Sequence, residues 1–287
     1  MHFKNDHAEA LKKKKSKSIR KNLSTIVLIL VFLVGIFLLL YPSVSDYWNS
    51  FHQSQTIANY AETVAEMDNE TYEHLWQDAF EYNKKLLTKS NRYYLNKSER
   101  EEYNSALNAS GNGIMGYIEI PSIKCSLPIY HGVDEAVLQI AIGHIEGTSL
   151  PAGGTSTHSA LSGHRGLPSA KLFTNLDQLE IGDIFMLRIL DETLTYEVDQ
   201  ILIVVPTDMS GLDIIEGEDL CTLISCTPFG VNTHRLLVRG HRIENQENAD
   251  SIRVIADAMQ IAPVLIAPFV AMPILFILLI ILMIKYR

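Results

Sequence analysis

Two long apolar stretches without charged residues lie near the ends of this 287-residue chain. The first, 23–41, would span about 28 Å as a helix at about 1.5 Å per residue, enough to cross the hydrocarbon core of a bilayer. The second, 261–284, contains three prolines, which a membrane helix tolerates when the freed carbonyls find partners. We therefore expect two transmembrane helices.

Each stretch has an alternative interpretation. The first could be a cleaved signal peptide, since small residues follow it at Ser43-Val-Ser45, but it is longer than the roughly 7–15 residues of a usual signal-peptide core. The second could be a sorting tail that is removed after export, yet no Leu-Pro-x-Thr-Gly-like signal precedes it. Both observations favour retained helices.

Two patterns divide the chain between these stretches. From about residue 46 to 109, apolar residues recur at three- and four-residue steps, which predicts two helices, around 57–67 and 75–86. After the break at 110–113, short apolar runs separated by Gly, Pro and Asp predict strands. These runs are 117–120, 171–173, 184–189, 195–198, 201–205, 222–225 and 236–238. Their spacing favours a mainly β domain that forms a closed or nearly closed barrel.

The net charge of −9 is unevenly distributed. Basic residues are concentrated in 1–22 and reappear in 285–287, and Lys and Arg mark the cytoplasmic flanks of membrane helices. Both termini are therefore predicted to be cytoplasmic, which makes this a two-pass cell-membrane protein with an extracytoplasmic middle. Residues 23–260 include 14 basic and 31 acidic residues, which disfavours nucleic-acid binding.

This reasoning predicts seven segments in chain order. They are a basic cytoplasmic tail (1–22), a transmembrane helix (23–41), an extracytoplasmic helical region (42–114), a β-barrel (115–243), a linker (244–260), a second transmembrane helix (261–284) and a cytoplasmic end (285–287).

The chain has three cysteines, an odd number for a domain in an oxidising exterior, so at least one lacks an intramolecular partner. Cys125 is interpreted as an inert buried residue. Cys221 and Cys226 lie on opposite faces of one predicted strand, and Cys226 ends that strand just before a Pro-containing turn. A strand end that opens onto a loop exposes a reactive group while its backbone stays fixed. Cys226 is therefore the candidate nucleophile.

A thiol becomes a strong nucleophile when a base or a cation favours the thiolate. His164, one of ten histidines, lies between two glycines in Ser162-Gly-His-Arg-Gly166. Further along, alternation places Leu236 and Val238 inward and Arg235 outward, beside the strand that ends in Cys226. A guanidinium there could hold a developing oxyanion or the substrate backbone.

The sequence offers other candidates for the catalytic base, for a metal site and for a carboxylate that orients His164. His234 is close to Cys226 in sequence, but strand parity points it away from Arg235. His144, His158 and His164 lack the short paired spacing of zinc ligands, so neither a metal nor another cofactor is predicted. A carboxylate could orient His164, and the sequence does not choose among the candidates Asp199, Asp208 and Asp213.

The stretch Thr222-Leu-Ile-Ser-Cys-Thr-Pro-Phe-Gly-Val-Asn-Thr-His-Arg-Leu-Leu-Val-Arg-Gly240 closely resembles the active-site region of class C sortases, the pilin-polymerising transpeptidases of Gram-positive bacteria. Upstream stretches at 115–121, 127–132, 143–154 and 162–168 resemble the same family in the expected order. The resemblance implies an eight-stranded sortase β-barrel in which Cys226 is the nucleophile, His164 the general acid/base and Arg235 the third active-site residue.

The resemblance also implies an activity and partners. Cys226 would cleave a Leu-Pro-x-Thr-Gly-like sorting signal of a pilin or surface protein between Thr and Gly, leaving a thioester that a pilin lysine amine resolves. The alternative is a sortase that attaches proteins to a peptidoglycan stem peptide. A less favoured alternative is a non-catalytic barrel that binds sorting signals and scaffolds pilus assembly.

Two features depart from the family pattern. Class C enzymes often have an N-terminal lid with an Asp-Pro-aromatic motif, and this chain contains no Asp-Pro dipeptide. Residues 83–112 could still cover the groove, with Arg92, Tyr93 and Tyr94 as the possible lid residues; the alternative is an ordinary linker between helix and barrel. Ser225 replaces the usual threonine before the cysteine, a loss of one methyl group that should change little.

Overall fold

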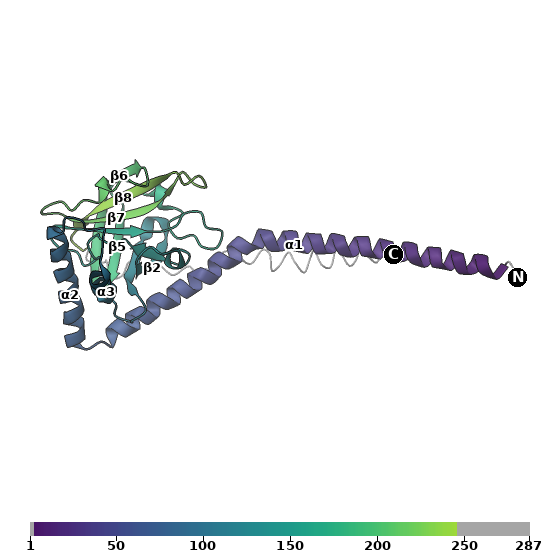
Figure 1. Ribbon diagram of the computed structural model, residues 1–287, viewed down its shortest axis with the longest axis horizontal. Helices are drawn as coiled ribbons and strands as arrows, with labels where there is room; N and C mark the ends of the chain where they lie inside the picture. Colours follow the sequence, from purple (N-terminus) through teal and green to yellow (C-terminus); the bar gives the residue numbers. More distant parts are fainter. Residues whose placement is uncertain (1–2, 246–287) are drawn as a thin grey trace.

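The computed structural model describes residues 3–245, and the second predicted transmembrane helix lies outside them. The chain begins with one long helix, α1 (Phe3–Ala65), which extends far from the rest of the molecule (Figure 1) and contains Pro42. Within the described residues, α1 is the one helix long and apolar enough to cross a membrane, and large apolar side chains such as Leu30, Phe37 and Leu39 are exposed along it. The predicted first membrane helix is thus part of a longer continuous helix.

The last part of α1 lies against the rest of the fold. Asn49 Nδ2 donates a hydrogen bond to the carbonyl of Ser169, and the backbone N–H of Lys171 donates to Asp46. The hydroxyl of Tyr60, a side chain only 1% exposed, donates to the carbonyl of Met115. These contacts fix α1 to the domain that follows it.

Two further helices precede the strands. α2 (Asn69–Thr88) begins at the N-cap Asp68 and buries one apolar stripe, and it includes the predicted helix around 75–86. The other predicted helix, around 57–67, forms the end of α1. A third helix, α3 (Lys97–Ser105), was not predicted, because Tyr103 is its single buried residue and it shows no apolar repeat. A capping box between Asn96 and Glu99 stabilises its start.

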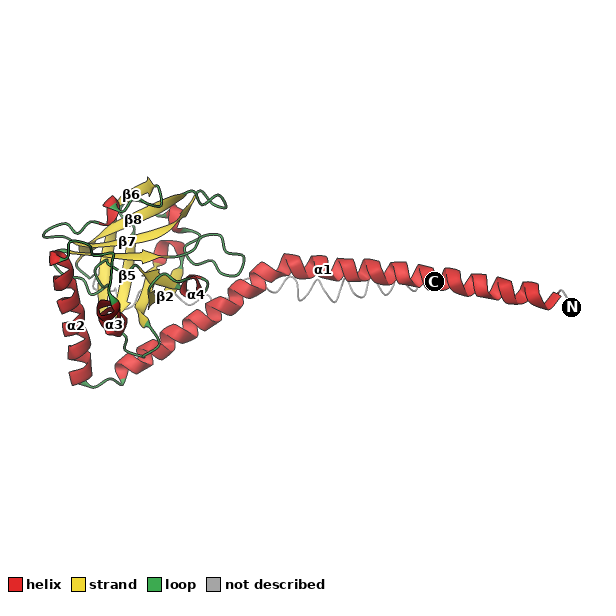
Figure 2. Ribbon diagram, viewed as in Figure 1, coloured by secondary structure: helices red, strands yellow, loops and turns green. Residues whose placement is uncertain are grey.

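Eight strands form a closed barrel in the order β1-β2-β3-β4-β7-β8-β6-β5 (Figure 2), which confirms the predicted fold class. The strands are β1 (Ile114–Ile120), β2 (Cys125–His131), β3 (Ile142–His144), β4 (Thr157–Ser162), β5 (Ile184–Ile189), β6 (Glu192–Val204), β7 (Asp219–Thr227) and β8 (His234–Ile243). The short helices between them are η1 (Pro121–Ile123), α4 (Glu135–Leu138), η2 (Leu176–Gln178) and η3 (Ser210–Leu212). Most neighbours are antiparallel, while β2 and β3, and β4 and β7, are parallel.

Two strand predictions were wrong in detail. Residues 171–173 form a turn, in which Leu172 has φ 38° and the fully buried Phe173 packs into the core, so these apolar residues anchor a loop. Residues 195–198 and 201–205 belong mostly to the single strand β6, whose pairing with β8 shifts at an irregularity between Val198 and Gln200. Such a bulge interrupts the alternation of side chains, so one strand looks like two in the sequence.

The two faces of β7 pack against different groups. Cys221 and Leu223 lie in the main core with Leu236 and Val238, as predicted for the inward face of β8. On the outer face, Ile224 and the three residues Ala160, Leu212 and Leu237 form a smaller buried cluster, called the outer cluster below. Because side chains alternate along a strand, Cys226 lies on the same outer face as Ile224.

Candidate active site

Three adjacent strands bring the predicted site residues to one end of the barrel. In the parallel pair β4 and β7, Ser162 is aligned with Ile224, and the N–H of Gly163 donates to the carbonyl of Ile224 at 3.0 Å. His164 follows directly, beside the part of β7 that contains Cys226. In the antiparallel pair β7 and β8, Cys226 is aligned with Arg235. The fold thus places His164, Cys226 and Arg235 side by side.

Cys226 is the accessible cysteine. All three cysteines are free, but Cys125 is 8% exposed and Cys221 is fully buried, whereas Cys226 is partly exposed. Burial, reinforced by the charge of Asp219, raises the pKa of the Cys221 thiol well above its ordinary value. Cys221 is therefore held as a neutral thiol, while Cys226 can meet a substrate.

The backbone around His164 is tightly packed. A Cβ on Gly163 would lie 2.7 Å from the ring of Phe173 and 2.8 Å from Ile142, so this position needs a glycine. The N–H of Phe173 donates to the carbonyl of His164 at 3.1 Å. The loop is fixed, while the imidazole side chain itself remains 27% exposed. A rigid backbone with an accessible ring suits a residue that exchanges protons.

The carboxylate near His164 comes from a residue that the sequence did not suggest. Glu135 Oε2, at the start of α4, lies 3.6 Å from His164 Nε2. A hydrogen bond from Gln139, with a smaller contribution from His164, holds the pKa of Glu135 below its ordinary value. The three aspartates considered as orienting groups bind elsewhere. Asp199 pairs with Arg239, Asp208 accepts bonds from Ser210, and Asp213 pairs with Arg92.

Arg235 is held by backbone carbonyls. Its Nη1 donates to the carbonyls of Asn232 at 3.3 Å and His234 at 3.1 Å, both in or next to the β7–β8 turn. Among the described residues, no carboxylate forms an ion pair with Arg235, whereas Arg239 on the same strand forms two hydrogen bonds with Asp199. Arg235 therefore keeps a positive charge beside Cys226 that no described carboxylate neutralises.

The loops on either side of the three residues touch each other. The guanidinium of Arg165 lies 5.6 Å from the ring centroid of Phe229, and Gly166, at φ +75°, leaves no space for a Cβ, which would lie 2.8 Å from that ring. The first loop follows β4 and the second joins β7 to β8. Phe229 remains 58% exposed. An exposed aromatic side chain at this position can contact a substrate, a role that its sequence context did not suggest.

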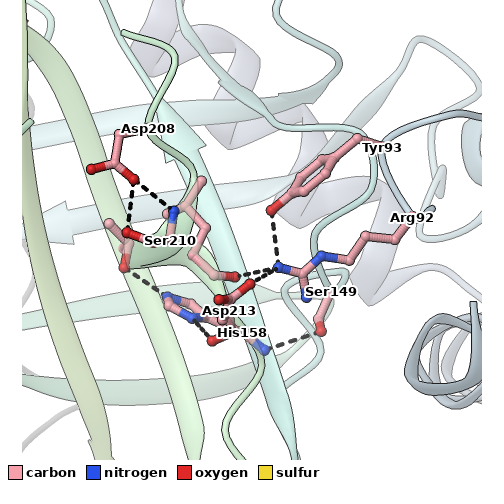
Figure 3. Close-up of polar contacts among 9 residues, drawn as sticks. Arg92, Tyr93, Ser149, His158, Asp208, Ser210 and Asp213 are labelled. Carbon is pink, nitrogen blue, oxygen red and sulfur yellow. Dashed lines mark hydrogen bonds and ion pairs between the residues drawn. The ribbon is translucent and has the colours of Figure 1, made fainter. Parts of the chain in front are cut away.

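The other candidate histidines have structural partners. His144 is fully buried between the hydroxyl of Tyr103 and the carbonyl of Ser149, and burial lowers its pKa to about 3. His158 bonds to the carbonyl of Asp213 and to Thr222 Oγ1 (Figure 3). The described hydrogen bond of the His234 ring is with the neighbouring Thr233 hydroxyl. Within residues 3–245, no group of three or more His, Cys, Asp or Glu is arranged to hold a metal ion.

The possible lid residues lie beside the β6–β7 loop, residues 205–218. Arg92 Nη2 donates to the carbonyl of Leu212, to Asp213 and to the hydroxyl of Tyr93. Figure 3 shows the Arg92 side chain reaching Asp213, near His158 on β4. Tyr94 is 71% exposed. The contacts described for Arg92 are therefore with the β6–β7 loop and not with Cys226.

Comparisons with known proteins agree with this geometry. The family model for the sortase domain matches residues 118–243. Sortase D of Bacillus subtilis is 30% identical over 131 residues, which cover 45% of this chain and 63% of that protein, so the chain spans less than two thirds of this relative. Sortase C1 from Streptococcus agalactiae has 53% identity and a TM-score of 0.65, covering 67% of this chain and 100% of that one. Sortase C of Streptococcus pneumoniae has 41% identity and a TM-score of 0.59, covering 66% and 97% respectively. The chain therefore belongs to the sortase family of transpeptidase enzymes, and its solved relatives confirm the predicted likeness to class C sortases.

Proposed function

We propose that this protein is a membrane-anchored cysteine transpeptidase that acts on a Leu-Pro-x-Thr-Gly-like sorting signal and transfers it to a pilin lysine. The observation that carries the proposal is that Cys226 is aligned with Arg235 on β7 and β8, while His164 directly follows the residue of the β4 loop that is bonded to Ile224 on β7. Of the three free cysteines, Cys226 alone is accessible, which supports it as the nucleophile.

The chemistry assigns a role to each residue. The Cys226 thiolate attacks the carbonyl carbon of the threonine, and the bond to glycine breaks as His164 gives a proton to the departing amine. A thioester joins the threonine to Cys226. The amine of the second substrate then attacks this thioester, His164 takes up the proton, and the thiolate leaves. No external energy source is required, because the thioester retains much of the energy of the cleaved amide.

Arg235 would stabilise the negative charge that develops on the threonine carbonyl oxygen. Both of its hydrogen bonds to the turn use Nη1, so Nε and Nη2 are oriented by the backbone and can bind an oxygen of the substrate.

Membrane attachment fits the same activity. The part of α1 that follows its apolar stretch contacts the loop that carries His164, through hydrogen bonds from Asn49 to Ser169 and from Lys171 to Asp46. Substrates held at the same membrane would meet Cys226 at a high effective concentration. The second membrane helix, 261–284, and the cytoplasmic position of both termini remain part of this proposal.

The proposed acceptor of the thioester is the lysine amine of a pilin. Pilin is favoured because the Streptococcus pneumoniae sortase C, one of the structural relatives, is described in terms of pilin substrate specificity. Transfer to a peptidoglycan stem peptide would instead support the wall-anchoring alternative.

The test is a mass-spectrometric search for an acyl adduct after the full-length protein in detergent is mixed with a sorting-signal peptide. We expect the adduct on Cys226, its loss in Cys226→Ala and its retention in Cys221→Ala, the matched control on the same strand. An adduct that persists in Cys226→Ala, or none in the wild-type protein, would contradict the mechanism. Adding either a pilin lysine peptide or a stem peptide then identifies the acceptor.

A further inference from the structure

The β6–β7 loop packs against the strand that carries Cys226. Leu212, in η3 of this loop, is 2% exposed and packs in the outer cluster against Ile224. Ile224 precedes Cys226 by two residues on the same face of β7, a separation of about 7 Å at about 3.3 Å per residue. The position of this loop therefore affects the surface of β7 beside the thiol.

Arg92 holds this loop from outside the barrel. Its Nη2 donates to the carbonyl of Leu212 at 2.9 Å and to Asp213 Oδ1 at 3.1 Å (Figure 3). The Arg92 side chain is only 13% exposed, although the Asp213 side chain is 74% exposed. A guanidinium that binds a carbonyl and a carboxylate together fixes both the distance and the orientation of its partners.

The same two loop residues are also held from the barrel. His158 Nδ1 donates to the carbonyl of Asp213 at 2.8 Å, while Thr222 Oγ1 donates to His158 Nε2 at 2.7 Å. Residues 212 and 213 thus have fixed partners on two sides: Arg92 in the helical region, and His158 on β4.

Few other contacts are available to replace Arg92. A cavity of about 750 Å³ opens between the two segments, lined by residues 86–93 on one side and by Asp213, Ile214 and Glu216 among others on the opposite side. Within the described part of the chain, Arg92 is the residue of 86–93 whose side chain forms hydrogen bonds to this loop. Removing the side chain should therefore leave the loop held from the barrel side alone, by His158 and the outer cluster.

We propose that Arg92 is a positioning residue that fixes the β6–β7 loop, through the carbonyl of Leu212 and the carboxylate of Asp213, in the position that binds the sorting signal. This inference rests on the proposed function. It gives residues 89–96 a role opposite to that of a lid. A lid over the cysteine inhibits and its removal raises activity, whereas Arg92 supports substrate binding and its removal lowers activity.

The experiment compares Arg92→Ala and Arg92→Lys with Arg100→Ala in the full-length protein. Arg100 is the matched control, because it also joins the helical region to the barrel, through an exposed ion pair with Glu146, without touching the β6–β7 loop. The measurements are KM and kcat for adduct formation with a sorting-signal peptide, and hydrogen–deuterium exchange in residues 206–217.

For Arg92→Ala we expect a KM raised about tenfold, a kcat within about twofold of the wild type, and faster exchange in 206–217. Arg92→Lys should show a smaller rise in KM, since its single ammonium nitrogen can donate to both partners, as Nη2 does, but from a shorter side chain. Arg100→Ala should leave all three quantities unchanged. An unchanged KM, an unchanged exchange rate or a raised activity in Arg92→Ala would overturn the inference, and raised activity would instead support a lid.

The two proposals fail in different ways. A wild-type protein that forms no adduct contradicts the transpeptidase function. An adduct that forms with the same KM in the wild type and in Arg92→Ala contradicts only the role of Arg92. If Arg92→Ala does not fold, Arg92→Lys decides the question, because an unchanged KM together with unchanged exchange in that variant would also overturn the inference.

Discussion

The strands β4, β7 and β8, together with the loop that follows β4, each supply one type of residue twice, once within the body of the barrel and once at the open end. The pairs are His158 and His164, Cys221 and Cys226, and Arg239 and Arg235. The body members have fixed partners or are buried. His158 is bonded on both ring nitrogens, Cys221 is fully buried, and Arg239 is paired with Asp199. The end members lie together and are partly exposed; their described side-chain partners are the exposed Glu135 at 3.6 Å from His164 and two turn carbonyls bonded to Arg235.

This difference shows that the position of a residue along the barrel, and not its type, decides whether it stabilises the fold or is available for catalysis. A fixed partner in the body stabilises one protonation state and one geometry, which favours folding. A catalytic group must change its protonation state or its partner during the reaction, so it needs a fixed backbone and an uncommitted side chain. The open end of the barrel provides both.

Substitutions of the two histidines should differ most in their effects on kcat and on the free energy of unfolding. In His164→Ala we expect kcat for adduct formation to fall about 10²–10⁴-fold, the usual contribution of a general acid/base, with little change in stability. In His158→Ala the partners Thr222 and Asp213 are left unsatisfied, so the free energy of unfolding should fall by about 2–3 kcal/mol while kcat stays within about threefold. Urea denaturation and single-turnover kinetics measure the two quantities. A His158 variant that loses kcat as strongly as the His164 variant would contradict the comparison.

Substitutions of the two arginines should also differ in their effects on the rate of adduct formation, by a smaller factor. Arg235→Ala should reduce the rate of adduct formation about 10²–10³-fold, as expected for the loss of one group that stabilises an oxyanion. Arg239→Ala removes the partner of Asp199 and should leave this rate within about threefold. Arg235→Lys is informative as well, because a lysine retains the charge and can donate to the two carbonyls of the turn, but has no counterpart of Nε and Nη2 to bind the substrate. Equal rates for Arg235→Ala and Arg239→Ala would show that Arg235 does not act on the substrate.

Much of this arrangement could be predicted from the sequence. Apolar alternation located β1, β5, β7 and β8, and strand parity placed Cys226 on the face opposite Cys221 and Arg235 on the outer face. β4 was missed because its buried residues include His158 and Ser159, whose polarity hides the strand pattern. The position of β4 beside β7 comes from a long-range parallel pairing, which leaves no local signal in the sequence.

The contacts of His164 show a second limit of sequence reasoning. Glu135 lies in the four-residue helix α4, and it approaches His164 because β3, which follows α4, pairs with β4. The aspartates considered as alternatives are engaged by Arg239, Ser210 and Arg92, contacts that depend on the folded β6–β7 loop and barrel. Which carboxylate meets which cation is decided by tertiary packing, and composition supplies only the candidates.

The buried histidines should make stability depend on pH. Burial lowers the pKa values of His131, His144 and His158, that of His144 from 6.5 to about 3. Below pH 6.5 the unfolded chain binds a proton at His144 and the folded chain does not until about pH 3, so the free energy of unfolding falls as the pH falls through this window. The expected slope for His144 is about 1.4 kcal/mol per pH unit within this window. His144→Asn should remove one histidine's share between about pH 6 and pH 5, where carboxylates contribute little. Urea denaturation at several pH values measures the slope, and an unchanged slope in the variant would contradict this assignment.

The smallest effect is expected at the carboxylate beside His164. Glu135 is 72% exposed and 3.6 Å from the imidazole, and exposed ion pairs contribute about 0–1 kcal/mol because water screens them. Glu135→Gln should therefore change the rate of adduct formation less than about threefold, and raising the salt concentration should produce a similar change in the wild-type protein. Gln139→Ala, which removes the hydrogen bond to Glu135 without touching His164, is the control and should have no effect on the rate. A loss of a hundredfold in Glu135→Gln would mean that the carboxylate orients His164 during catalysis, and the open end of the barrel would then rely on a fixed partner in the way its body does.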